Sequence, residues 1–197
     1  VRSGFFEHRT FRRELEVHIG RVMISKPGYE RVIGHIDNQP DVCSVFYFTD
    51  RFYKTLQEHY QHEAGWLFRN NDIHTVVINC PPYLDYLHHM ILQQPSAICF
   101  DTMLMDEWIL QLVDKVMRVL SNEPVISTLP KGLKRFHLTT IESAKDYLIK
   151  NFHKKISLGD VAEHCCVSLF HFSRIFKSIM KITPYQYLTA LRLQHAS

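Results

Sequence analysis

The stretch that decides the fold lies near the C-terminal end of the chain, where residues 156–188 read ISLGDVAEHCCVSLFHFSRIFKSIMKITPYQYL. Ser157 followed three residues later by Asp160 is typical of a helix start, and the apolar spacing after it predicts a short helix. Ser168 caps a second helix after a tight connection at residues 165–167. Two short helices that meet across a three-residue turn predict a helix-turn-helix.

The second predicted helix has an apolar side and a mixed polar side. Arg174 lies on the polar side, and a guanidinium can pair with both major-groove acceptors of guanine. Lys177 is expected to contact a phosphate instead. The spacing predicts an inward stripe of Leu169, Phe172, Ile175, Phe176 and Ile179. The residues expected to bind DNA are Leu169, Phe170, His171, Ser173, Arg174, Lys177 and Ser178.

Two more helix starts flank this unit. Thr183, with a proline directly after it and Gln186 three residues on, predicts the cap of a closing helix. Thr139 with Glu142 predicts a capping box that opens an earlier helix ending near Asn151. Periodicity and caps alone are also consistent with a small helical bundle of another purpose.

Charge is divided unevenly along the chain, whose net charge is only +3. Residues 131–197 hold 11 Lys/Arg against 4 Asp/Glu, whereas residues 1–130 hold 12 against 16. A basic C-terminal part favours a polyanionic partner there, and the acidic remainder favours another task. A solvated basic face is the alternative explanation of the same asymmetry.

The N-terminal part begins with strands and continues with helices. Short apolar runs at residues 17–19, 21–25, 31–33 and 42–48 are separated by turn residues and predict strands. After residue 49 the apolar spacing becomes helical. It predicts an amphipathic helix over about residues 105–120, with Trp108, Leu112, Val116, Val119 and Leu120 near one face.

Three segments follow from these patterns. Two prolines and a glycine between residues 121 and 136 predict a linker, and the charge balance changes at the same place. Residues 1–120 then form an N-terminal domain and residues 137–197 an all-α helix-turn-helix domain. The expected fold class is therefore α+β.

The run from Ile156 to Ala162, with Phe172-Ser173-Arg174-Ile175-Phe176-Lys177 and the segment from Ile182 to Ala196, resembles the first half of an AraC-type DNA-binding domain. The resemblance implies base contacts by Phe170, Ser173 and Arg174. It also implies that Arg192 and Leu193 start a helix joining two subdomains, with a second helix-turn-helix beyond Ser197. Residues 20–29 and 45–49 resemble the later strands of that family's cupin-like effector domain, which implies a partial barrel followed by helices.

The expected partners are double-stranded DNA, a small-molecule effector in the N-terminal domain and a second copy of the chain. No cofactor, metal or membrane is expected, and no stretch is apolar enough for a membrane span. The location is expected to be cytoplasmic. The missing initiator methionine and the abrupt ends at Val1 and Ser197 indicate a fragment. Five scattered cysteines favour reduced, mostly buried thiols.

Two other function classes remain open. A cupin-like metal enzyme is one, because His8, His18 and His35 lie in the right half, although their spacing matches no ligand set. No catalytic motif such as a nucleophile elbow or phosphate loop accompanies them. A protein-interaction module, in which the basic bundle binds an acidic partner, is the other.

Overall fold

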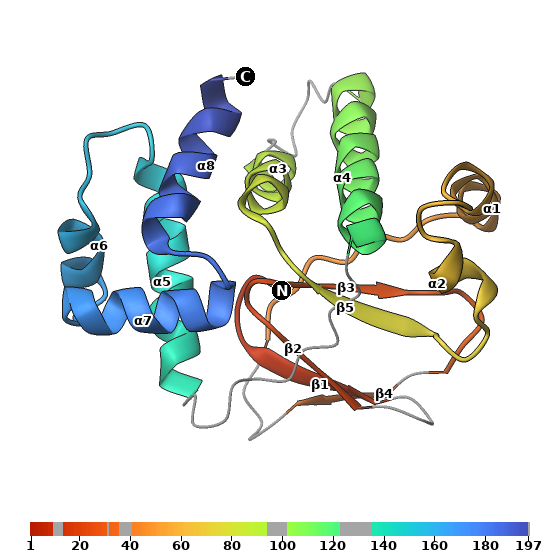
Figure 1. The fold of residues 1–197 in the computed structure, drawn as a ribbon, viewed down its shortest axis with the longest axis horizontal. Coiled ribbons are helices and arrows are strands. Elements are labelled where there is room, and N and C mark those ends of the chain that lie inside the picture. Colours follow the sequence, from red (N-terminus) through yellow and green to blue (C-terminus); the bar gives the residue numbers. More distant parts are fainter. Residues whose placement is uncertain (10–13, 31, 36–40, 94–101, 123–134, 197) are drawn as a thin grey trace.

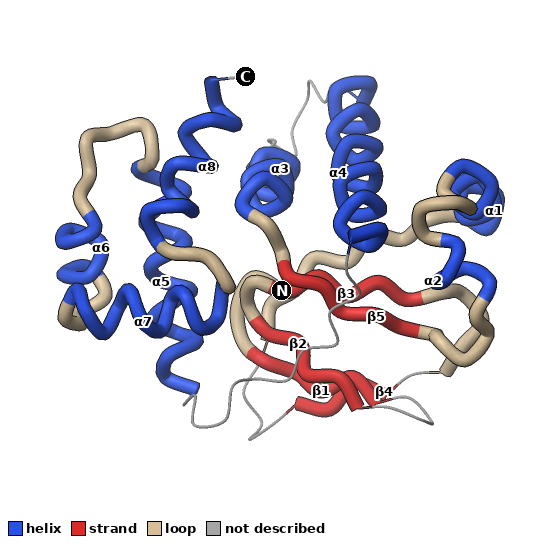
Figure 2. Tube along the Cα trace, in the orientation of Figure 1, coloured by secondary structure: helices blue, strands red, loops and turns tan. Residues whose placement is uncertain are grey.

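The computed structural model describes residues 1–9, 14–30, 32–35, 41–93, 102–122 and 135–196. The elements divide into an N-terminal lobe of strands and helices and a C-terminal lobe made only of helices (Figures 1 and 2). The α+β expectation is confirmed at this level. The predicted linker falls mostly on residues 123–134, which lie outside the described residues.

Two small antiparallel sheets form the base of the N-terminal lobe. β1 (Phe5–Arg9) lies between β2 (Glu14–His18) and β4 (Val32–His35), while β3 (Arg21–Ser25) pairs with β5 (Thr75–Asn79). A small apolar cluster joins the two sheets. Alternate residues of a strand point to the same face, so one face of each sheet can contribute side chains to it. Its buried members are Phe6, Leu15, Val17 and Val77. Within the described residues, these sheets do not close into a barrel.

Helices cover the β3–β5 sheet on one face (Figure 1). The helices at residues 50–59, 65–69 and 102–122 pack there through a core that also includes residues of β3, β5 and the connection between the first two helices. None of the helices that the structure describes is long and apolar enough to span a membrane. The helices are α1 (Asp50–His59), α2 (Gly65–Arg69), α3 (Pro82–Gln93) and α4 (Thr102–Asn122).

Four helices build the C-terminal lobe around one core. The buried residues of this core come from all four helices and include the completely buried Ile141, Leu148, Phe172, Phe176 and Leu191. The helices are α5 (Arg135–Asn151), α6 (Leu158–His164), α7 (Leu169–Met180) and α8 (Pro184–Ala196).

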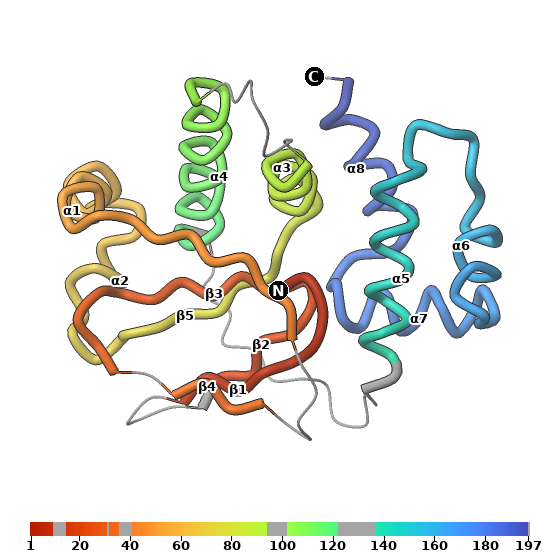
Figure 3. Tube along the Cα trace, turned by 180° about the vertical axis from the view of Figure 1, so that it is seen from behind, coloured from red at the N-terminus to blue at the C-terminus, as the bar shows by residue number. Residues whose placement is uncertain are grey.

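Two predictions for the strands were wrong. Residues 42–48 form no strand beyond a single bridge between Ser3 and Val42, and they cross the lobe as a loop that leads to α1 (Figure 3). The apolar run does not find a neighbouring strand, and Tyr47 stays 82% exposed. The expectation of helices alone after residue 49 missed β5, a buried run of β-branched residues that is typical of a strand.

The start of the first C-terminal helix was also predicted wrongly. α5 begins at Arg135, so Thr139 lies exposed inside the helix and does not cap it. The buried Leu138 packs into the core of the lobe and extends the helix toward the N-terminus. Glu142 accepts a hydrogen bond from the backbone N–H of Gly4, at 2.8 Å, so its carboxylate serves a contact between the lobes.

Candidate nucleic-acid interface

Local side-chain caps fix where α6 and α7 begin. The Oγ of Ser157 accepts from the backbone N–H of Asp160 at 3.2 Å, and Asp160 Oδ2 accepts from the N–H of Ser157 at 2.7 Å. Ser168 Oγ accepts from the N–H of His171 at 3.3 Å. These bonds satisfy amides that a helix start leaves without an intrahelical partner. The caps predicted at both serines are confirmed by these contacts.

A tight turn between α6 and α7 sets the angle of the two helices. Cys166 has φ 55°, in the left-handed region that residues other than glycine adopt only in special turns. The N–H of Val167 then reaches back to the carbonyl of Ala162 at 3.0 Å. Sequence reasoning gave no sign of this conformation, because cysteine has no preference for it.

The inner side of α7 is anchored in the core of the lobe. Its stripe is as predicted except at Leu169, whose side chain is 48% exposed and does not face inward. Leu169 is the first residue of α7, where no preceding turn of the same helix covers it. The buried residues of α7 are Phe172, Ile175, Phe176, Ile179 and Met180.

The outer side of α7 presents an apolar ring and two cations. Phe170 is 79% exposed, and Arg174 and Lys177 are exposed beside it. Ser173 and Ser178 are half-buried at the edges of this face. His171 is also half-buried, and its ring lies 5.3 Å from that of His137 on α5. The structure thus exposes Phe170, Arg174 and Lys177, whereas His171, Ser173 and Ser178 are half-buried.

The end of α7 and the start of α8 are joined by a short connection. Lys181 ends α7 with φ 64°, the left-handed C-cap conformation that glycine usually supplies. Thr183 and Gln186 then form a reciprocal box, with N–H to side-chain oxygen distances of 2.9 and 3.2 Å. The cap predicted at Thr183 is confirmed. Tyr185 in the next turn is 66% exposed, a position that helical spacing opposite Tyr187 would have indicated.

Arg192 has a structural role that sequence reasoning missed. Its Nε donates to the carbonyl of Phe152 at 2.9 Å and its terminal nitrogen to the carbonyl of Lys154 at 3.0 Å. Both carbonyls follow the end of α5, where backbone acceptors have no intrahelical donor. Arg192 therefore ties α8 to the connection between α5 and α6.

The histidines considered for a metal site contact different groups. His18 Nδ1 donates to the carbonyl of Ile19 at 2.7 Å, and His35 Nδ1 lies 2.6 Å from Asp41. His8 is completely buried on β1. Over the described ranges, no group of three or more His, Cys, Asp or Glu side chains has the arrangement needed to hold a metal ion.

Comparison with known proteins identifies the helical unit. Residues 148–189 match the family of bacterial regulatory helix-turn-helix proteins, AraC family. The chain is 35% identical over 57 residues to the lactose operon transcription activator of Staphylococcus xylosus. It is 33% identical over 49 residues to the melibiose operon regulatory protein of Escherichia coli strain K12. The alignments cover 29% and 25% of this chain, and the chain spans only 20% and 16% of the two relatives.

Among solved structures, ToxT from Vibrio cholerae is similar over 95% of this chain and 86% of its own, with 13% identity and a TM-score of 0.32. A TM-score of this size does not establish a shared overall fold, so the assignment rests on the matched helices. Residues 148–189 form a helix-turn-helix domain of the AraC family.

Proposed function

We propose that this chain is a sequence-specific DNA-binding regulator of transcription and that the outer face of α7 reads base edges in the major groove. The observation that carries the proposal is the contrast between the two sides of α7. Phe172 and Phe176 are completely buried, while Phe170 remains 79% exposed next to Arg174 and Lys177. A helix anchored on one side and bearing exposed cations on the other is suited to a groove.

The exposed residues of α7 would divide into reading and anchoring groups. Arg174 can form a bidentate pair with guanine, and the Phe170 ring can contact a thymine methyl group. Ser173 can bind several base edges or a phosphate, and Lys177 would neutralise a phosphate. We retain Leu169, His171 and Ser178 as peripheral members of the proposed interface. Leu169 is half-exposed at the start of α7.

Selection from random double-stranded DNA tests this function. The wild-type chain should enrich one motif, and the triple variant Phe170→Ala, Ser173→Ala, Arg174→Ala should enrich none. The matched control removes Asp146 and Lys150, an exposed i,i+4 ion pair on α5, so that the net charge is unchanged. This control should enrich the wild-type motif. A wild-type chain that enriches no motif would refute sequence-specific binding.

We also propose that the N-terminal lobe is the cupin-like, effector-binding part of the regulator. It carries an open hollow of about 640 Å³ lined by Gly65, Trp66, Arg69, Asn70 and Asn71. An indole face with amide and guanidinium groups suits a small polar molecule. The names of the relatives refer to lactose and melibiose operons, but those matches identify no ligand for this lobe. A ligand that raises the unfolding midpoint of the wild type but not of Trp66→Ala would support the site.

A homodimer through α4 is a further part of the proposed function. Met103 and Leu110 of α4 are 81% and 53% exposed, and apolar side chains on a helix surface favour association. Light scattering should give twice the chain mass for the wild type and a single chain mass for Leu110→Glu. A single chain mass for the wild type would refute the homodimer. Twice the chain mass for both proteins would place the dimer contact elsewhere.

A further inference from the structure

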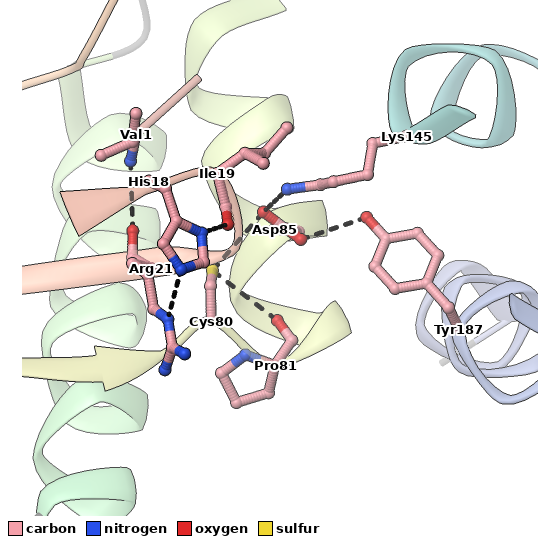
Figure 4. Close-up of polar contacts among 9 residues, drawn as sticks. All are labelled: Val1, His18, Ile19, Arg21, Cys80, Pro81, Asp85, Lys145 and Tyr187. Carbon is pink, nitrogen blue, oxygen red and sulfur yellow. Dashed lines mark hydrogen bonds and ion pairs between the residues drawn. The ribbon is translucent and has the colours of Figure 1, made fainter. Parts of the chain in front are cut away.

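A buried carboxylate of the N-terminal lobe binds two helices of the DNA-binding domain. Asp85 lies on α3 and is only 8% exposed. Its Oδ1 accepts from Lys145 Nζ of α5 at 2.8 Å, and its Oδ2 accepts from the Tyr187 hydroxyl of α8 at 3.1 Å. The Cys80 thiol lies 3.4 Å from Oδ1, within the same lobe as Asp85 (Figure 4). One carboxylate therefore connects both lobes.

Burial makes this contact costly to break on one side only. The side chains of Lys145 and Asp85 are 8% and 9% exposed, so each charge has lost most of its hydration. Removing one partner of such a pair leaves an uncompensated buried charge, whereas removing both is close to neutral. Burial raises the pKa of Tyr187 and of Cys80, so both groups are neutral hydrogen-bond donors to the carboxylate.

A second contact reaches the end of α7. The turn between β2 and β3 places Ile19, 2% exposed, in the core of the C-terminal lobe. Gly20, with φ 78°, follows it, and a Cβ at this position would lie 2.7 Å from Met180 Sδ. Met180 is the last residue of α7. The N-terminal lobe thus touches α5, α7 and α8 in a single interface.

We propose that Asp85 is a latch that fixes the orientation of the DNA-binding domain against the N-terminal lobe, and that the lobes separate by release of Lys145 and Tyr187 from it. The latch positions the domain and does not mask it, because Phe170 and Arg174 remain exposed while the contact is closed. The docking of the lobes does not rest on the function proposed above, whereas its consequence for DNA binding does.

Amide hydrogen exchange of the full chain without DNA tests the docking. Asp85→Asn should speed exchange at the facing sides of α3, α5 and α8 by about tenfold or more, because Lys145 loses its counter-charge. The double variant Asp85→Asn, Lys145→Met should return exchange to within about threefold of the wild type, since neither charge then remains buried. The control Asp146→Asn breaks an exposed pair on α5 and should change nothing.

Exchange in α6, which contributes no residue to the Asp85 contact, separates release from unfolding. Release leaves exchange in α6 unchanged. If Asp85→Asn speeds exchange everywhere, Tyr187→Phe decides, because it removes one hydroxyl and should speed exchange at α3 and α8 alone by about threefold. The latch is overturned if the exchange rates at α3 and α8 in Asp85→Asn stay within about twofold of the control. Where Tyr187→Phe is the deciding variant, the same limit applies to its exchange rates.

DNA binding of the same variants tests whether the latch positions or masks. Because the outer face of α7 is exposed in the closed state, Asp85→Asn should change the affinity for a single selected site by less than about twofold. An affinity increase of about tenfold would show masking and overturn the positioning role. A wild-type chain that binds no DNA would refute the proposed function but leave the exchange results unaffected.

Discussion

The two lobes place their apolar side chains differently. The C-terminal lobe gathers them in one core shared by four helices, and its large exposed apolar residues lie on α7 and α8. In the N-terminal lobe the buried residues form smaller clusters, and large apolar residues remain exposed on β4, on α4 and in the segment 42–48. The difference indicates that packing in the C-terminal lobe leaves few large apolar side chains exposed, whereas the N-terminal lobe keeps more apolar surface suited to partners.

The largest expected effect comes from the core of the C-terminal lobe. Phe176 is completely buried between Phe172 and Tyr187, at ring distances of 5.5 Å to each. Phe176→Ala should lower the free energy of unfolding by about 3–5 kcal/mol, through lost apolar burial and the cavity left behind. Chemical denaturation measures this value.

The matched change in the N-terminal lobe is Tyr47→Ala, which removes an aromatic side chain that is 82% exposed. It should alter the free energy of unfolding by no more than about 0.5 kcal/mol. If both substitutions cost the same, the contrast between the lobes is wrong.

The pH dependence of stability tests a buried histidine at the interface between the lobes. Burial, with the charges of Arg21 and Lys181, lowers the pKa of His18 from 6.5 to about 4. Between these values the unfolded chain binds a proton that the folded chain does not. The contribution of His18 to the free energy of unfolding is therefore fully present above pH 6.5. It is lost as the pH drops toward 4 and amounts to about 3 kcal/mol in total.

Denaturation at several pH values, with His18→Gln as the comparison, isolates this group. Gln keeps one donor for the carbonyl of Ile19 and one acceptor for Arg21 but does not titrate in this range. Its profile should be flatter than that of the wild type. A residual slope is expected from His88, whose pKa burial also lowers to about 4. Parallel profiles would show that His18 titrates normally in the folded chain.

The sequence predicted the C-terminal lobe better than the N-terminal lobe because its signals are local. Ser157, Ser168 and Thr183 each bond an amide three residues away, so a short window of sequence contains the whole interaction. The β3–β5 pairing joins residues such as Val22 and Ile78, far apart in the chain. No local pattern specifies that partner, although the β-branched run at residues 75–79 is itself a local strand signal, which the helical interpretation overlooked.

Errors in the C-terminal lobe occurred where distant contacts compete with local ones. Glu142 matched a local capping pattern, but its carboxylate binds Gly4 of the other lobe. The Asp85 contact with Lys145 and Tyr187 was invisible for the same reason. The polar face of α7 was predicted from spacing, whereas the half-burial of His171 depends on α5 and required the structure.

At the proposed DNA interface, the expected effects are smaller and concern recognition. Arg174→Ala should cost about 1–3 kcal/mol on the preferred site and relax discrimination at one base position, because a bidentate pair to guanine is lost. Non-specific affinity should fall much less. Selection from random DNA, followed by binding titrations, measures both. An unchanged motif and affinity would remove Arg174 from the reading surface.

Lys177→Ala serves as the partner of that experiment, since Lys177 lies three residues further along the same helix. It should weaken binding to all sequences about equally and reduce the slope of log K against log salt by about one, because one phosphate contact is lost. Titrations at several salt concentrations give the slope. A change of preferred sequence in this variant would instead assign Lys177 a base contact.

The smallest expected effect compares a capped helix from each lobe. Ser157 caps α6, which buries Val161 and Ala162, and Thr49 caps α1, which buries no residue. Losing a cap costs about 1 kcal/mol of helix stability.

In α6 that cost should appear in the free energy of unfolding of the whole domain, because α6 can fray only by exposing core residues. In α1 the cost should remain local, so Thr49→Ala should speed amide exchange in α1 and leave the denaturation midpoint in place. Denaturation and amide exchange of Ser157→Ala and Thr49→Ala measure this difference. Equal shifts of the midpoint would show that α1 contributes to the cooperative core despite its exposed surface.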